Sequence, residues 1–142
     1  MLVRLLYASR AAASLDESVI DNILAQCRRN NPRLGITGIL CHSGARFIQV
    51  LEGGRDQVCD LYNSLTRDPR HAQLRILRYE EIDERRFGGW TMGEVDIERV
   101  NPALLLKYAE RPELDPASAP GHASMALLEE LIATNAVVSR AV

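Results

Sequence analysis

Three polar side chains stand where the surrounding residues predict a buried core or a helix end. Gln49 lies between Phe47 and Leu51 on one face of an apolar segment, and Tyr7 shares a face with apolar neighbours near the start of the chain. A buried amide without partners costs about 1–3 kcal/mol, and a buried phenol also needs a partner. We therefore expect Tyr7 to pair with Gln49. This pair is either a satisfied contact within the core or a ligand site, and Asn31 either caps a helix or binds the same ligand.

A second polar cluster, Asp68-Pro-Arg70-His71, follows a predicted helix. Such a tetrapeptide is typical of a helix cap and turn, with Arg70 and His71 in solvent. The alternative is a cationic pair that grips a phosphate, because the planar guanidinium of arginine matches phosphate geometry. The tetrapeptide by itself favours the turn.

Familiar metal and catalytic motifs are missing from the sequence. Cys27, Cys41 and Cys59 include no CxxC pair, and the three histidines form no HExxH pattern, so we expect buried free thiols rather than a zinc site or disulfides. The sequence also has no GxGxxG, no phosphate-binding P-loop and no GxSxG elbow. The sequence therefore lacks the motifs by which several large enzyme classes are usually recognised.

Length and charge restrict the function further. The chain has 142 residues and a formal net charge of -2, which predicts one domain with an appendage and gives no reason to expect nucleic acid or a membrane surface as a partner. No apolar run approaches the roughly 20 residues that span a bilayer, and the N-terminus does not resemble a secretion signal. A cytoplasmic location is the expectation.

The apolar spacing predicts the elements that position these side chains. Alternation indicates strands, and apolar residues at i, i+3, i+4 and i+7 indicate helices. Ser14 and Glu17 form a capping box at the start of the first helix, and Asn30-Asn31-Pro32 is expected to end it. The expected strands are 2–9, 36–42, 46–52, 74–82 and 90–95, and the expected helices run to about residues 29 and 67. Trp90 and Met92 would share a face of the last strand, a spacing that core packing ordinarily explains.

This order, β-α-β-β-α-β-β, predicts an α+β fold of the ferredoxin-like type, with two helices over one face of the sheet. The hairpin strands carry apolar residues on both faces, so the second face also needs cover. Residues 102–109 and an apolar stripe from Ser124 to Ile132 predict helices in the tail. We expect residues 96–142 to form a helical extension that covers the second face of the sheet or mediates oligomerisation, and the sequence leaves both options open.

The sequence resembles the BLUF domain, a family that senses blue light using FAD. The resemblance covers residues 1 to about 95 and extends more loosely into the tail, as in short single-domain members. The ordered set of motifs carries it, namely Arg4-Leu-Leu-Tyr7-Ala-Ser9, Arg29-Asn-Asn31, Gly35-Ile-Thr-Gly38-Ile-Leu, Phe47-Ile-Gln-Val-Leu-Glu-Gly53, Asp68-Pro-Arg-His71 and Arg86-Phe-Gly-Gly-Trp90-Thr-Met92.

This resemblance implies FAD between the two helices, with Tyr7 as electron and proton donor to the excited flavin. Gln49 would bridge the phenol to flavin N5 and O4. The implied contacts to the cofactor are made by Tyr7, Ile23, Asn30, Asn31, Gln49, Asp68, Arg70 and His71. Trp90 and Met92 match a segment that alternates in and out during signalling. The implied partners are an unidentified downstream response protein and further copies of the chain in a homo-oligomer.

Two other functions remain open from the residues alone. One is a small hydrolase of the acylphosphatase kind, which needs a cradle of backbone amides for phosphate, although residues 10–14 contain no glycine. The other is a colourless interaction module that has kept the fold without the flavin. A non-enzymatic photoreceptor is the preferred interpretation, and a yellow purified protein would separate it from both alternatives.

Overall fold

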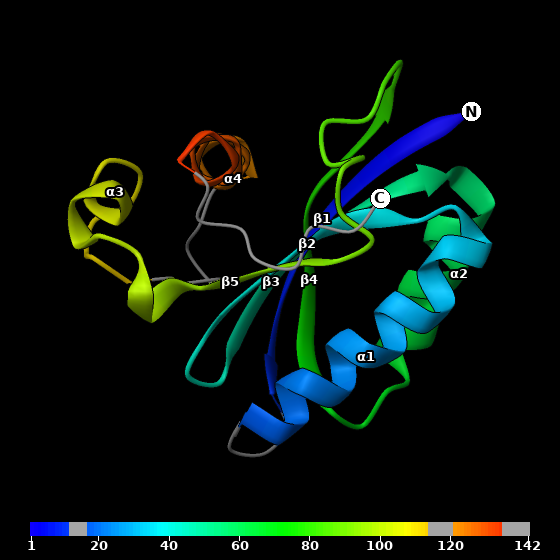
Figure 1. The fold of residues 1–142 in the computed structure, drawn as a ribbon, viewed down its shortest axis with the longest axis horizontal. Helices are drawn as coiled ribbons and strands as arrows, with labels where there is room; N and C mark the ends of the chain where they lie inside the picture. The colour runs from blue at the N-terminus through cyan, green and yellow to red at the C-terminus, as the bar shows by residue number, and fades with distance from the viewer. Residues whose placement is uncertain (12–16, 114–120, 135–142) are drawn as a thin grey trace.

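A five-stranded mixed sheet is the centre of the computed structural model, which describes residues 1–11, 17–113 and 121–134 (Figure 1). The strands lie in the order β4-β1-β3-β2-β5, with neighbours antiparallel except for the parallel pair β2 and β5. Their bounds are β1 (Leu2–Ala11), β2 (Thr37–Ser43), β3 (Arg46–Gly54), β4 (His71–Ile82) and β5 (Gly93–Asp96).

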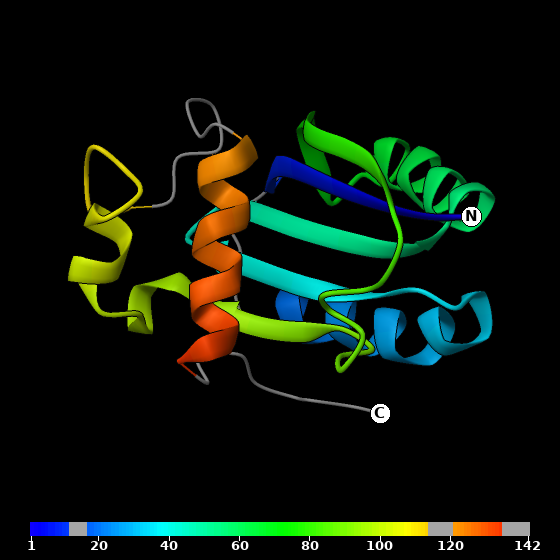
Figure 2. The ribbon, with the colours of Figure 1, turned by 90° about the horizontal axis from the view of Figure 1, so that it is seen from above.

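Helices cover both faces of this sheet, as Figures 1 and 2 show. Helices α1 (Glu17–Leu34) and α2 (Arg55–Thr66) pack on one face, and α4 (Gly121–Ala133) crosses the other. The short helices η1 (Ile97–Arg99) and α3 (Pro102–Leu106) connect β5 to the tail. The predicted α+β ferredoxin-like fold, with two helices over one sheet face, is confirmed.

Alternation along the strands divides the apolar side chains into two cores. Val3, Leu5, Phe47 and Leu51 pack under α1 and α2, whereas Leu6 on the opposite face belongs to the core that α4 completes. On α4, the residues that face this second core are Ser124, Met125, Leu127, Leu128 and Leu131. The sheet is therefore buried on both sides, with the predicted helix face carrying Tyr7 and Gln49.

Helix α1 does not end where the sequence predicted. It continues through Asn30, Asn31 and Pro32 to Leu34, and the proposed N-terminal cap Ser14 lies outside the described residues. The helix ends in a Schellman motif, because Gly35 takes a φ of 68° and the amide of Ile36 donates to the Asn31 carbonyl at 3.0 Å. The prediction was wrong because a helix-ending glycine and tertiary packing outweighed the local preference of the residue before proline.

The last strand also begins later than predicted, at Gly93 rather than Trp90. Trp90 and Met92 therefore do not share a strand face. Trp90 packs in the α4-side core, and Met92 packs in the core beneath α1 and α2. Residues 83–92 instead follow an irregular path past the ends of the strands, where the carboxylate of Glu52 on the central strand β3 accepts hydrogen bonds from the amides of Arg86 and Phe87.

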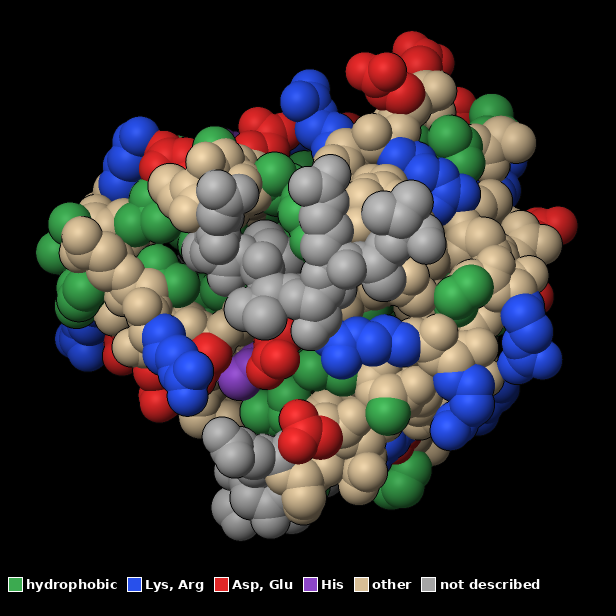
Figure 3. Space-filling view, in the orientation of Figure 1, with side chains coloured by type: hydrophobic (Ala, Val, Ile, Leu, Met, Phe, Trp, Pro, Cys, Tyr) green, Lys and Arg blue, Asp and Glu red, His purple; other side chains and the backbone are tan. Residues whose placement is uncertain are grey.

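The described surface carries charges of both signs. Basic and acidic side chains are interspersed over the face drawn in Figure 3. Among the described residues, no helix combines the length and apolar character needed to cross a membrane. The mixed surface fits the small formal net charge.

Candidate functional site

The predicted pair of Tyr7 and Gln49 forms at the centre of the sheet. The two residues stand directly opposite each other on β1 and β3, and both side chains are buried. The Tyr7 hydroxyl donates to Gln49 Oε1, while Gln49 Nε2 donates to the sulfur of Met92 at 3.2 Å. The amide therefore has its oxygen toward the phenol and its nitrogen toward the thioether.

Burial also fixes the protonation state of the phenol. Desolvation raises the pKa of Tyr7 well above its ordinary value, and the neighbouring Cys27, Tyr62 and Asp68 raise it further. Tyr7 is therefore a neutral hydrogen-bond donor at physiological pH. Its ring meets the Tyr62 ring edge-on, with centroids 5.6 Å apart, so the phenol is held by packing as well as by Gln49.

A cavity of about 310 Å³ opens beside this pair, between α1 and α2. Its volume lies at the lower end of the range for small-molecule sites. Tyr7 lies behind its wall, joined to it through Gln49. Every other predicted cofactor-contacting residue lines the cavity, namely Ile23, Asn30, Asn31, Gln49, Asp68, Arg70 and His71.

One side of the cavity carries an ion pair. Arg70 binds Asp68 at 2.6 Å and the side chain of Gln26 at 2.8 Å. The hydrogen bonds from Arg70 hold the pKa of Asp68 below its usual range, so the carboxylate stays charged. The guanidinium is thus oriented toward the cavity rim rather than free in solvent.

His71 supplies a polar group to which no described residue gives a partner. His71 is the first residue of β4 and is 7% exposed. Its Nδ1 lies 3.1 Å from the Ser9 hydroxyl. Its Nε2 is buried and has no hydrogen-bond partner among the described residues. Burial also lowers the pKa of His71. A buried polar atom of this kind calls for a partner, and a ligand in the cavity can provide one.

Six further residues line the cavity that sequence reasoning did not assign to the site: Gln26, Cys27, Leu34, Leu61, Ser64 and Leu65. On α1 they continue the stripe of Ile23 and Asn31 at helical spacing, so the signal was present. The expected helix end near Arg29 excluded Leu34, whereas Gln26 and Cys27 lay within the expected helix and no motif marked them as site residues. Cys27 is a free thiol that is half-buried rather than buried as expected, and desolvation raises its pKa to about 11.

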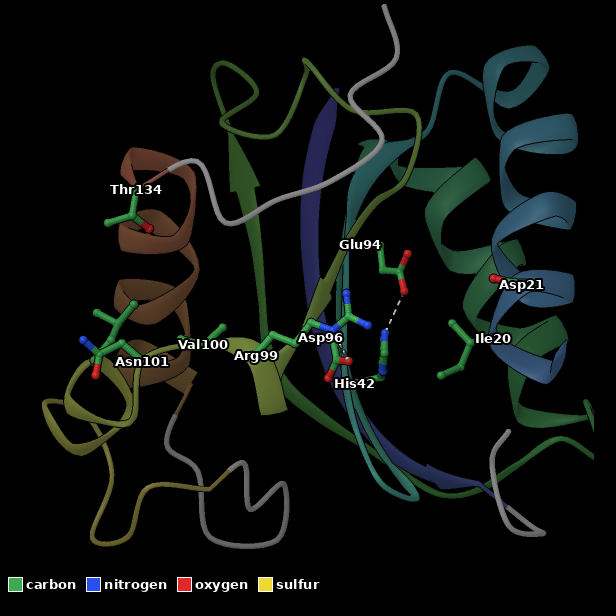
Figure 4. Close-up of a pocket in the computed structure, with 10 residues that line it drawn as sticks. Ile20, Asp21, His42, Glu94, Asp96, Arg99, Val100, Asn101 and Thr134 are labelled. Atoms are coloured by element: carbon green, nitrogen blue, oxygen red, sulfur yellow. Dashed lines mark hydrogen bonds and ion pairs between the residues drawn. The ribbon is translucent and has the colours of Figure 1, made fainter. Parts of the chain in front are cut away.

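A second, larger cavity of about 720 Å³ lies at the β5 edge, between α1 and the tail (Figure 4). Four of its charged or titratable lining residues form two pairs. His42 Nε2 lies 2.9 Å from Glu94, as Figure 4 shows, and Arg99 lies 3.5 Å from Asp96. We place the functional site in the smaller cavity, because its lining holds Gln49, which is bonded to Tyr7, and a buried nitrogen of His71 that has no partner among the described residues.

A comparison with known families identifies the family of this chain. Residues 2–93 match the family model described as sensors of blue-light using FAD. The chain belongs to the BLUF family. This membership confirms the resemblance seen in the sequence motifs.

Individual BLUF proteins are similar over different lengths. The chain is 33% identical over 92 residues to photoactivated adenylate cyclase subunit beta of Euglena gracilis and 34% identical over 88 residues to the blue light- and temperature-regulated antirepressor BluF of Escherichia coli. These matches cover 64% and 62% of the chain but only 11% and 22% of those relatives, so the chain spans a small part of their length.

Solved BLUF structures match almost end to end. BlrB, a BLUF protein in its dark state, has a TM-score of 0.74 and 35% identity, with 94% of this chain and 96% of BlrB covered. The photo-activated state of BlsA has a TM-score of 0.79 and 30% identity, with coverages of 93% and 95%. The similarity thus includes the tail beyond the sensor motifs.

Proposed function

We propose that this chain is a blue-light photoreceptor that binds FAD non-covalently in the cavity between α1 and α2. The observation that carries the proposal is the buried Tyr7–Gln49 pair at the wall of a cavity whose lining also holds His71, whose buried Nε2 has no partner among the residues that the structure describes. A flavin has both hydrogen-bonding edges and an apolar ring system, so the mixed lining fits it.

The cavity lining suggests a role for each cofactor-contacting residue. Ile23 would pack against the ring system, and Asn30 and Asn31 would hydrogen-bond its polar edge. Asp68, Arg70 and His71 would hold the same molecule from the α2 side, where Arg70 supplies positive charge and His71 an unsatisfied ring nitrogen. The Asp68 carboxylate already has a charged partner within the cavity lining, because it pairs with Arg70.

We propose that light-driven, proton-coupled electron transfer from Tyr7 and a rearrangement of Gln49 are the primary events. FAD, when bound, absorbs blue light and supplies an excited state that oxidises a neighbouring phenol. Tyr7 gives up an electron and its hydroxyl proton, and the Gln49 amide can relay that proton because it offers both an acceptor and donors. Gln49 then rotates or tautomerises before Tyr7 recovers its electron and proton, which leaves new hydrogen bonds to the cofactor.

The light signal would pass from the site to the rest of the protein through residues 90–92. Rearrangement of Gln49 removes its hydrogen bond to Met92, which disturbs the segment that also carries Trp90 into the α4-side core. A change of a few kcal/mol is enough to bias two arrangements of one segment. We propose that a downstream protein reads this change, that homo-oligomer contacts contribute, and that the chain itself catalyses no reaction.

An absorption spectrum of the purified protein, taken in the dark and directly after blue light, tests the function. We expect a flavin spectrum that shifts slightly to the red and returns in darkness, because the hydrogen bonds to the flavin change while its covalent structure does not. Extraction and chromatography of the pigment would identify FAD. A protein that is colourless and takes up no added FAD would instead be an interaction module that has kept only the fold.

Alkylation of Cys27 tests the position of the cofactor independently of light. With a pKa of about 11, roughly a thousandth of this thiol is ionised at pH 8, so we expect iodoacetamide to react about a hundredfold more slowly than with an unperturbed thiol. Saturating FAD should slow the reaction further, because Cys27 lines the cavity. Peptide mass spectrometry resolves Cys27 from Cys59, which lies outside the cavity lining and serves as the control. Equal rates with and without FAD would place the cofactor elsewhere.

A further inference from the structure

Residues 90–92 join the two cores without belonging to the strand ladder. Pairing between β2 and β5 begins only at Gly93, opposite Ile39. Trp90 belongs to the α4-side core, and Met92 two residues later belongs to the core beneath α1 and α2. This segment, which we call the crossing segment, therefore passes from one side of the sheet to the other at its β5 edge.

Each backbone carbonyl of the crossing segment is held by a group from outside it. The Trp90 carbonyl accepts a hydrogen bond from the Gly38 amide at 3.1 Å. The Thr91 carbonyl accepts one from Asn31 Nδ2 at 3.4 Å, and the Met92 carbonyl accepts one from Arg28 Nη2 at 3.3 Å. Rotation of the Asn31 or Arg28 side chain releases the hydrogen bond that it donates. Backbone hydrogen bonds between two paired strands would instead have to break together.

The two side-chain donors stand three residues apart on α1 and so project from one face of the helix. They differ in their relation to the cavity. Asn31 lines it, whereas Arg28 does not. The Arg28 side chain is half-buried, and its Nε has no hydrogen-bond partner among the described residues. Its contact with the Met92 carbonyl therefore links this guanidinium to the crossing segment.

Gly38, which donates to the Trp90 carbonyl, is itself fixed in place by the close approach of β2 and β3. A Cβ at position 38 would lie 1.9 Å from the Val50 carbonyl oxygen, so the strand can place its amide against Trp90 only with glycine there. The Gly38 amide is thus a rigid reference point on the sheet. Its hydrogen bond to the Trp90 carbonyl reports whether the crossing segment is in place.

We infer that Arg28 is a positioning residue that holds the crossing segment with Met92 against Gln49, and that its bond to the Met92 carbonyl opens when the light signal leaves the cavity. The light-dependent part of this inference, the opening of the bond between Arg28 and Met92, rests on the proposed function. Met92 is held on one side by the Gln49 amide and on the other by Arg28. If Gln49 rearranges, its hydrogen bond to the Met92 sulfur is lost, and the hydrogen bond from Arg28 to the Met92 carbonyl is then the remaining side-chain restraint on Met92. Arg28 then determines how readily the crossing segment moves.

Hydrogen exchange of the Gly38 amide in the FAD-loaded protein tests this inference. We expect Arg28→Ala to raise the dark exchange rate of this amide about tenfold, since a hydrogen bond from a charged side chain is lost. Arg28→Lys should give an intermediate rate. The matched control is Arg29→Ala, an exposed neighbour on the same helix, which should leave the rate unchanged. Amides of the β1–β3 ladder should exchange as in the unmodified chain in every variant, which shows that the fold is intact.

Illumination supplies the second half of the test. In the unmodified chain, blue light should raise Gly38 exchange toward the rate of the dark Arg28→Ala variant, and light should change that variant little further. An unchanged dark rate in Arg28→Ala would overturn the positioning role. A Gly38 rate that blue light leaves unchanged, in a chain that still shows the flavin red shift, would overturn the light-dependent role. A chain without any flavin shift would reject the proposed function, while the dark exchange comparison would still decide what Arg28 does.

Discussion

Replacing Tyr7 with phenylalanine should leave FAD bound but abolish the red shift that blue light produces. The hydroxyl is the only group removed, and it is the group that donates to Gln49 Oε1. Without it, the chain loses the proton that Gln49 would relay and the phenol that would be oxidised. Tyr7 does not line the cavity directly, so the binding surface for FAD stays in place. Absorption spectra in the dark and after light measure both effects on one sample.

Tyr62→Phe is the matched control for this variant. Tyr62 also carries a phenol, and its ring lies edge-on to that of Tyr7 with centroids 5.6 Å apart. Gln49 bonds Tyr7 and Met92 rather than Tyr62, so replacement of Tyr62 should preserve the red shift. The Tyr7 variant should also be less stable without FAD by about 1–3 kcal/mol, because the Gln49 oxygen loses its buried donor. A normal photocycle in Tyr7→Phe, or its loss in Tyr62→Phe, would contradict the proposed role of Tyr7.

The largest effect on stability is expected from Glu52→Gln. Glu52 is fully buried on β3 and binds Arg4 at 2.8 Å, while the same carboxylate accepts the amides of Arg86 and Phe87. The amide side chain leaves Arg4 buried with a single remaining acid, Glu80. Removing one partner from a buried ion pair typically costs about 3–5 kcal/mol. Urea denaturation of the two proteins should show this loss in the free energy of unfolding.

An exposed ion pair of the same chain provides the comparison. Arg55 and Glu81 join α2 to β4, but their side chains are 49% and 60% exposed. Glu81→Gln should therefore change the free energy of unfolding by less than about 1 kcal/mol. If Glu52→Gln costs no more than Glu81→Gln, the buried network does not hold residues 86–87 to the sheet. The irregular path that leads to Trp90 and Met92 would then need another explanation.

Several features of the site follow from the sequence because they depend on short-range periodicity. Alternation along residues 2–9 and 46–52 indicated that Tyr7 and Gln49 would face the same layer, and the β1–β3 register then places them opposite each other. Helical spacing placed Ile23 on the face of α1 that packs on the sheet. The ordered motifs were sufficient to indicate the family, and a family model confirms it.

Other features depend on contacts between distant residues. The extension of α1 to Leu34 and the split of Trp90 and Met92 between two cores contradict local preferences. Both arise where tertiary contacts outweigh the weak bias of a few neighbouring residues. His71 shows the same limit, because a turn residue in the sequence becomes a buried cavity residue once β4 pairs with β1 through it.

The sequence by itself determined that Tyr7 and Gln49 face one layer of the sheet, since strand and helix periods act over a few residues, and its ordered motifs indicated the family. The tertiary structure alone decided where the cavity opens, which of its atoms lack partners and how residues 90–92 cross the sheet edge. Those features are set by hydrogen bonds between elements up to about 60 residues apart, as between Asn31 and Thr91, and no local pattern encodes such contacts.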